Sequence, residues 1–303
     1  MRMLPQFPMY IVSKGRWESR LTSKAFEKMQ IPYFVVVEEQ EFEQYASVID
    51  RSKLLILDKK YQRDYDTFDD LGDSKSKGPG PARNFAWEHS ISIGARWHWV
   101  HDDNISGFCR LNHNKRVPCD SPAIFRAAED FVDRYENVAV SGLGYRFEGG
   151  THRDKQPPFT LNTRIYSCLL IRNDIPYRWR GRYNEDTDLS VRALKDGWCT
   201  VLFRAFRCDK LATQSIKGGN TDAFYASEGT LAKSRMQIAM HPDISKLVWR
   251  YGRWHHYVDY SVFSRNELRL KDNVNIPEGI NNFGMILMEN GRISLTTQLP
   301  VVE

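Results

Sequence analysis

Hydrophobic and polar positions follow two different periods along the first two thirds of the chain. Short runs rich in β-branched and aromatic residues, at 10–12, 33–37 and 53–57, predict strands, whereas the stretches 22–29 and 41–49 carry apolar side chains at helical spacing. The run at 33–37 has no charged residue, which is typical of a strand covered on both faces. This alternation predicts an α/β fold with a mainly parallel central sheet and right-handed crossovers.

The same alternation resumes after a polar stretch at 59–77, which we expect to be a mobile loop. Further helices are predicted at 82–93, 121–135 and 187–195, and further strands at 96–101, 138–141, 163–171 and 200–203. There is no internal repeat. We expect residues 1–206 to form the core and residues 207–303 a C-terminal extension packed on it as part of one compact unit, with a β-rich last segment from 265.

Composition places the chain among ordinary globular proteins. Of its 303 residues, 41% are hydrophobic and 27% charged, so a sizeable core can form. No apolar run is long enough to span a bilayer, and the N-terminal residues do not resemble a signal peptide. The five cysteines have no CxxC spacing, which favours reduced thiols and a cytoplasmic protein without a membrane contact. The net charge of +5 indicates a polyanionic partner only if the basic residues cluster.

The first candidate for chemistry is the acidic group Asp102, Asp103 and Asn104, which follows a predicted strand. Ligands of open α/β sheets bind at the carboxyl ends of the strands, where such side chains would lie. Adjacent oxygen-bearing side chains suit Mg²⁺ or Mn²⁺, and such an ion neutralises a leaving diphosphate. A turn or a helix cap explains the same residues equally well when they are taken alone.

Two further groups lie at predicted helix starts. The segment Gly78–Asn84 is a Gly/Pro loop that opens a helix and offers N–H groups to an anion. Arg83 in its first turn opposes the helix dipole, which makes sense if it faces a phosphate; an ordinary turn is the simpler alternative. In Asn184–Asp188, one of three carboxylates could be a general base, although helix capping explains them too.

The order of these groups is more specific than any one of them. The chain resembles the GT-A nucleotide-sugar glycosyltransferases, and within them the TET/JBP-associated glycosyltransferases of phages and some eukaryotic genomes. The resemblance spans roughly residues 8–220. It rests on these segments: Tyr10–Arg16, Val35–Glu38, Pro81–Asn84, Trp99–Ile105, Arg164–Cys168, Arg180–Ser190 and Lys195–Trp198. It implies a Rossmann-like GT-A core in residues 1–206 and, for a phage protein, a location in the host cytoplasm.

The resemblance also implies roles for single residues. A UDP-sugar donor would bind against Ser13, Arg16, Glu38, Arg83, Asn84, Asp102 and Lys217, with Arg83 at the diphosphate. The segment Lys217–Asn220 could form a loop that closes over donor and acceptor, and a plain turn explains it equally well. Mn²⁺ or Mg²⁺ would be held by Asp103, Asp102 and His255, or by His256 in place of His255. Because the triplet is Asp-Asp-Asn and not Asp-x-Asp, Asp103 is the favoured ligand. Asp186 would be the catalytic base, with Glu185 beside it.

The expected acceptor is DNA. The segments Arg178–Tyr183 and Trp249–Tyr257 interleave basic and aromatic residues, which suits a nucleic-acid surface, although sugar stacking or simple burial would give the same pattern. The family's proposed acceptor is a hydroxymethylated pyrimidine such as 5-hydroxymethylcytosine, which receives a hexosyl or pentosyl group. Two alternatives remain: a GT-A enzyme that acts on a protein, lipid or glycan, and a non-catalytic nucleic-acid-binding protein.

Overall fold

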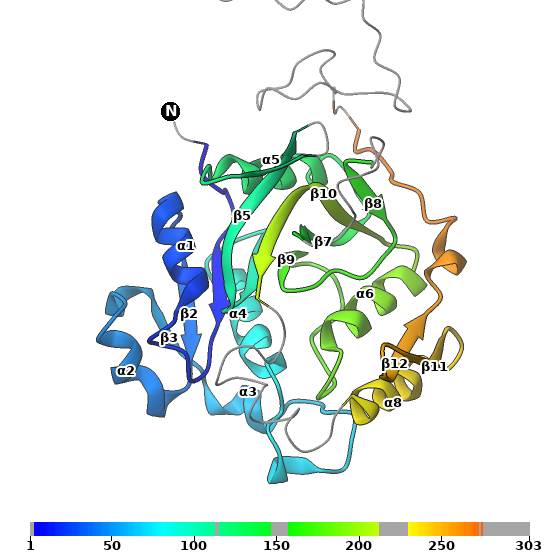
Figure 1. Ribbon diagram of the computed structural model, residues 1–303, viewed down its shortest axis with the longest axis horizontal. Coiled ribbons are helices and arrows are strands. Elements are labelled where there is room, and N and C mark those ends of the chain that lie inside the picture. Colours follow the sequence, from blue (N-terminus) through cyan, green and yellow to red (C-terminus); the bar gives the residue numbers. More distant parts are fainter. Residues whose placement is uncertain (1–2, 113–114, 147–156, 212–229, 273, 275–303) are drawn as a thin grey trace, which may run out of the picture.

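The computed structural model describes residues 3–112, 115–146, 157–211, 230–272 and 274. Their centre is a ten-stranded sheet in the order β3-β2-β1-β4-β9-β7-β10-β5-β6, with β8 paired to β10 (Figure 1). The strands are β1 (Met9–Val12), β2 (Phe34–Val37), β3 (Leu54–Ile56), β4 (Trp97–Asp102), β5 (Ile105–Asn112), β6 (Lys115–Pro118), β7 (Val138–Tyr145), β8 (Phe159–Leu161), β9 (Cys168–Arg172) and β10 (Cys199–Lys210).

The predicted mixed α/β class with a large central sheet is confirmed. Strands β3, β2, β1 and β4 are all parallel, as are β7 and β10. The pattern did not reveal that β9 enters between β4 and β7 antiparallel to both, or that β5 pairs antiparallel to β10. The chain runs outward from β1 to β3 and then returns to β4 on the other side of β1. This reversal creates a switch point at the carboxyl ends of β1 and β4.

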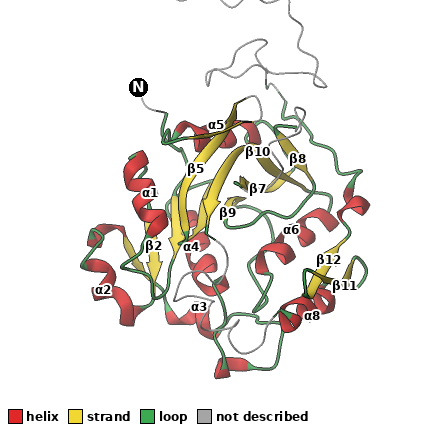
Figure 2. Cartoon of the chain, in the orientation of Figure 1, coloured by secondary structure: helices red, strands yellow, loops and turns green. Residues whose placement is uncertain are grey.

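Helices cover both faces of the sheet (Figure 2). On one face Phe26 of α1 (Leu21–Met29) and Phe125 of α5 (Ala123–Val132) pack edge to face with ring centroids 5.9 Å apart. On the other face Trp87 of α4 (Gly80–Ser92) and Leu189 of α6 (Glu185–Lys195) belong to a second core cluster. Two shorter helices, α2 (Phe42–Ala46) and α3 (Lys59–Arg63), follow β2 and β3.

The predicted loop at 59–77 is held to the core. It begins with α3, and its later part is bound by Arg182, whose side chain is fully buried. Nη1 of Arg182 donates to the carbonyl oxygens of Lys75 and Ser76 at 2.8 and 2.6 Å, and Nη2 donates to that of Gly72 at 3.0 Å. A partner more than a hundred residues away thus satisfies part of the polar backbone of the loop, and its mobility stays a prediction.

The segment after the sheet packs on α6. Helix α8 (Leu231–Met240) precedes the hairpin of β11 (Ser245–Arg250) and β12 (Arg253–Val258), and Val258 joins Val191 and Leu194 in a small apolar cluster. The boundary predicted at residue 206 falls inside β10, which continues to Lys210. The expected β-rich segment lies largely outside the described residues. Within the described parts of the chain, no helix is long and apolar enough to cross a membrane.

Candidate active site

A cavity of about 610 Å³ opens at the switch point of the sheet. Val12, Val37 and Asp102, which end β1, β2 and β4, line it together with the first turns of α4 and α6. Its lining includes eight basic and six acidic side chains. Because basic residues are in excess, the cavity favours an anionic ligand.

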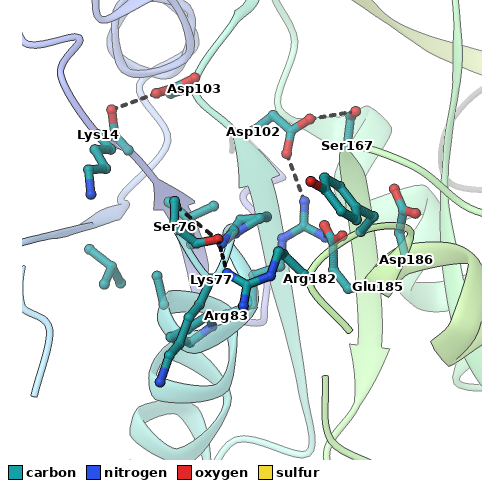
Figure 3. Close-up of a pocket in the computed structure, with 18 of the residues that line it drawn as sticks. Lys14, Ser76, Lys77, Arg83, Asp102, Asp103, Ser167, Arg182, Glu185 and Asp186 are labelled. Atoms are coloured by element: carbon teal, nitrogen blue, oxygen red, sulfur yellow. Dashed lines mark hydrogen bonds and ion pairs between the residues drawn. The ribbon is translucent and has the colours of Figure 1, made fainter. Parts of the chain in front are cut away.

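Asp102 accepts hydrogen bonds from three side chains at the end of β4, among them Ser167 (Figure 3). Its Oδ1 accepts a hydrogen bond from Nη2 of Arg83 at 2.8 Å. Its Oδ2 accepts from the hydroxyl of Ser167 and from Nζ of Lys210, both at 2.7 Å. Burial alone would raise the pKa of Asp102, but the charges of Lys210 and Arg83 outweigh it and hold the pKa well below its ordinary value. Asp102 is therefore a permanent anion within a group of donors.

Asp103 is oriented differently and contacts the segment after β1. Its Oδ2 accepts from the hydroxyl of Ser13 at 2.8 Å, and its Oδ1 forms an ion pair with Arg16. Burial raises the pKa of Asp103 above its ordinary value, although Arg16 and Ser13 act in the opposite direction. Asn104 next to it is buried. The strand end thus holds two carboxylates, each already bound to basic side chains.

Arg83 lies in the first turn of α4, with its guanidinium stacked on Trp179 at 4.7 Å from the ring centroid. It joins the two acidic groups of the site, because Nη1 also forms an ion pair with Oε1 of Glu185 at 3.2 Å. The helix start is tightly packed: a Cβ on Gly80 would lie 1.8 Å from the hydroxyl oxygen of Tyr65. This glycine is required for packing, whatever ligand the loop binds.

Glu185 and Asp186 begin α6 and line the cavity across from Lys14 and Asp103 (Figure 3). Burial raises the pKa of Glu185 to about 7, although the charge of Arg83 lowers it. Asp186 uses Oδ1 to accept from the backbone N–H of Thr187 at 2.7 Å. Within the described chain its Oδ2 has no hydrogen-bond or ion-pair partner. One carboxylate oxygen of this cavity-lining residue therefore has no partner among the described residues.

The predicted nucleotide-side residues lie at the far end of the same cavity. Ser13, Arg16 and Glu38 all line it. Glu38 receives a hydrogen bond from Nζ of Lys14 at 2.7 Å, and the hydroxyl of Ser13 lies 2.6 Å from that of Tyr45. These contacts fix the side chains before any ligand binds.

Three of the predicted residues are not part of the cavity lining. Asn84 hydrogen-bonds the backbone N–H and the carbonyl of Trp179 at 2.9 and 3.0 Å, which holds α4 to the segment before α6. His255 lies on β12 and accepts from Nε of Arg253 at 3.2 Å. Lys217 lies outside the described residues. His256, the other histidine considered, is also on β12 and does not line the cavity.

A metal site at the strand end would need oxygen atoms that are not already bound to other groups. Across the described ranges, no three acidic, histidine or cysteine side chains are grouped so that they could hold a metal ion. Both oxygens of Asp102 and of Asp103 already accept from hydroxyl or basic groups. The side chains as arranged do not fit Mn²⁺ or Mg²⁺, which need several free oxygen ligands. The metal requirement stays a prediction.

Comparison with known proteins identifies the family. The family described as TET-Associated Glycosyltransferase matches residues 7–219, which is more than half of the chain. The chain belongs to this family. The protein is accordingly a glycosyltransferase. A search of the curated proteins found no match.

The match includes every element that lines the cavity of this TET-associated glycosyltransferase except α8, which contributes Lys233. It also includes two site residues that the sequence reasoning missed, Ser167 and Lys210. Ser167 has a φ of 59°, a left-handed conformation that is strained for a serine and is often found at functional sites. Its position inside the matching segment Arg164–Cys168 was its only signal in the sequence. Nothing near Lys210 distinguished it from other lysines of a strand.

Proposed function

We propose that this glycosyltransferase moves a sugar from a UDP-sugar to a hydroxymethylated pyrimidine, such as 5-hydroxymethylcytosine, in DNA. The observation that carries the proposal is the cavity itself, where the free oxygen of Asp186 faces a donor end rich in basic groups. A transferase needs these two parts together. One accepts a proton from the attacking hydroxyl, and the other binds the leaving diphosphate.

In the proposed transfer, the acceptor, the donor and Asp186 account for the proton, the new bond and the leaving group. The acceptor hydroxyl loses its proton to Asp186 as its oxygen forms a bond to the anomeric carbon of the sugar. The bond from that carbon to the diphosphate oxygen breaks, and the nucleoside diphosphate leaves with the electron pair. Two observations support Asp186 in this role: its Oδ1 accepts from the N–H of Thr187, and its Oδ2 has no partner within the described residues. Glu185 keeps Arg83 in place instead.

The donor end suits a nucleoside diphosphate. A base and ribose would lie near Ser13, Arg16 and Glu38 after β1 and β2, and the diphosphate near Arg83. The order of parallel strands around β1, followed by an acidic strand end on β4, supports a GT-A arrangement of this core. Both the UDP-sugar and the GT-A assignment belong to this proposal.

The acceptor end is supported by the β11–β12 hairpin. Trp249 and Trp254 face each other across it with ring centroids 5.2 Å apart, and Tyr251 at its tip is 92% exposed. Arg250 and Arg253 form a directly opposed pair, which is unfavourable for folding because the charges are alike. Within the described chain no carboxylate pairs with either arginine. Exposed rings and guanidinium groups without a described carboxylate partner suit bases and phosphates.

The test is transfer to defined DNA. Duplexes with 5-hydroxymethylcytosine, 5-hydroxymethyluracil or unmodified cytosine are incubated with a panel of UDP-sugars, digested to nucleosides and analysed by mass spectrometry. We expect a hexosyl or pentosyl mass increase on a hydroxymethylated nucleoside alone, and none with Asp186→Asn. Hydrolysis of the UDP-sugar without any modified nucleoside would favour a protein, lipid or glycan acceptor. DNA binding without nucleotide binding or transfer would indicate a non-catalytic protein.

A further inference from the structure

Lys210 occupies a position in the candidate active site for which the proposed function has given no role. It is the last residue of β10, and β10 pairs antiparallel with β5, which begins directly after the acidic strand end. This pairing brings Nζ of Lys210 to 2.7 Å from both Oδ2 of Asp102 and Oγ of Ser167. Asp102 and Ser167, each more than forty positions away in the sequence, thus fix the direction of the Lys210 ammonium group.

Lys210 forms an ion pair with Asp102, with Nζ 2.7 Å from Oδ2. The adjacent carboxylate favours the cationic form of the amine. An ammonium group has three protons. Asp102 and Ser167 accept two of them, and in the described part of the chain no third acceptor is present. The remaining proton is available to a ligand of the cavity, which Lys210 lines.

Arg83 presents a second incompletely bonded group beside it. The two side chains are joined by Asp102, with Arg83 on Oδ1 and Lys210 on Oδ2. Nη1 of Arg83 is buried and has an ion pair with Glu185 but no hydrogen bond among the described residues. Asp102 therefore acts as a spacer that holds two cations side by side.

We propose that Lys210 and Arg83 bind the diphosphate of the donor and neutralise it without a divalent ion. This inference rests on the proposed function, and it replaces the metal by side chains of the chain itself. Asp102 and Asp103 contact three basic side chains, Arg83, Lys210 and Arg16, and Arg83 also pairs with Glu185. Neither aspartate is therefore free to hold a divalent ion, whereas the remaining N–H groups of Lys210 and Arg83 can donate to a diphosphate.

In the transfer step these two groups act on the leaving side. As the bond between the sugar carbon and the diphosphate oxygen breaks, the negative charge on the phosphate grows. Lys210 and Arg83 donate hydrogen bonds to the phosphate oxygens and stabilise that charge. Neither residue is the base, so loss of Lys210 weakens nucleotide binding itself, before any acceptor is involved.

The experiment measures binding without an acceptor. The full-length protein is titrated calorimetrically with UDP, and separately with ADP and GDP as probes of base preference, first with EDTA and then with Mn²⁺ or Mg²⁺. We expect at least one of these nucleotides to bind in EDTA with an affinity that the metal changes by less than about twofold. Binding that vanishes in EDTA and returns with Mn²⁺, or no binding of any of the three, would overturn the proposal.

Two variants separate charge from structure. Lys210→Met should weaken nucleotide binding in EDTA by about tenfold or more, the size of one charge-assisted hydrogen bond. It should also make binding more responsive to Mn²⁺, because Asp102 then loses one of its two cationic partners and keeps only Arg83 and the hydroxyl of Ser167. Lys210→Arg should retain most of the affinity. Lys195→Met, which removes an exposed lysine paired with Asp243, is the control and should bind as the wild type does.

Each outcome is informative about one proposal. Loss of affinity in Lys210→Met with an unchanged melting temperature supports the cationic diphosphate site. Unchanged affinity in that variant contradicts it, whatever the DNA assay gives. Conversely, metal-independent nucleotide binding combined with no transfer to hydroxymethylated DNA would leave this inference standing and reject the proposed acceptor.

Discussion

Arg182 and Asp69 form a bidentate ion pair, with Nε to Oδ2 at 2.7 Å and Nη2 to Oδ1 at 2.8 Å. The arginine side chain is fully buried and that of Asp69 is 17% exposed. The pair links the segment before α6 to the loop before α4, whose later residues line the cavity. One ion pair therefore holds together the two segments that surround the candidate diphosphate site.

Loss of this pair should loosen the loop. Arg182→Met leaves Asp69 and three backbone carbonyls without their donor, so we expect a destabilisation of about 3 kcal/mol, typical of a broken buried pair. Trypsin should then cut after Lys75 or Lys77 faster than in the wild type. Urea unfolding followed by tryptophan fluorescence, together with limited proteolysis and mass spectrometry, measures both effects.

The matched control for this variant is Asp73→Asn. Asp73 belongs to the same loop and pairs with Lys77, but its side chain is 90% exposed. Exposed pairs contribute little, so neither the unfolding midpoint nor the cleavage rate should change. Equal cleavage in Arg182→Met and in the wild type would mean that the arginine does not hold the loop.

Replacement of the proposed base should separate catalysis from binding. In Asp186→Asn the oxygen that accepts the proton becomes part of a neutral amide, so we expect kcat to fall by about 10²–10⁴-fold. Nucleotide affinity should stay within about threefold, because no described contact joins Asp186 to the donor end. A comparable loss in Glu185→Gln together with full activity in Asp186→Asn would assign the base to Glu185 instead.

Glu129 should make the stability depend on pH. It is buried on α5 and accepts from the N–H groups of Gln6 and Phe7 and from Nε1 of Trp99, at 2.7, 3.2 and 2.9 Å. Burial raises the pKa of Glu129 to about 7, even though these donors lower it. Because the pKa of Glu129 is higher in the folded than in the unfolded state, its contribution to the free energy of unfolding is complete below the unfolded pKa near 4.5. This contribution is lost as the pH rises through 7.

This pKa shift predicts that Glu129 alone lowers the free energy of unfolding by about 3 kcal/mol between pH 4.5 and 8. Glu185 has a pKa raised in the same direction, so the wild-type curve contains both contributions. Urea unfolding at several pH values, compared between the wild type and Glu129→Gln, isolates the first. Parallel stability curves for the two proteins would show that Glu129 does not titrate in this range.

Much of this fold follows from local patterns. The apolar run at 33–37 became the buried strand β2, and the helix expected at 22–29 is α1 with one more residue. Asp102, Asp103 and Arg83 meet in one cavity, as expected for residues at strand ends and helix starts of one sheet edge. These features are local, since a strand's periodicity and its terminal residues are close in sequence.

The features that the sequence did not reveal depend on distant pairing. The antiparallel entry of β9 brings Ser167 to Asp102, and the pairing of β10 with β5 brings Lys210 there from 108 positions away. Periodicity contains no information about strand order, so these partners could not be anticipated. For the same reason the sequence did not show that basic side chains from elsewhere in the chain pair with the acidic strand end.

The β11–β12 hairpin provides the last prediction, because it lies beyond the family match and should contribute to DNA binding alone. Each stacked base contributes about 1–3 kcal/mol, so Trp249→Ser with Tyr251→Ser should weaken DNA binding by about tenfold or more without changing nucleotide affinity. Arg250→Gln should instead reduce the salt dependence of DNA binding by about one unit of slope. Fluorescence anisotropy at several salt concentrations measures both. Ile93→Ser, which removes a side chain 53% exposed on another part of the surface, is the control. Equal DNA affinity in the hairpin variant and this control would show that the acceptor strand binds elsewhere.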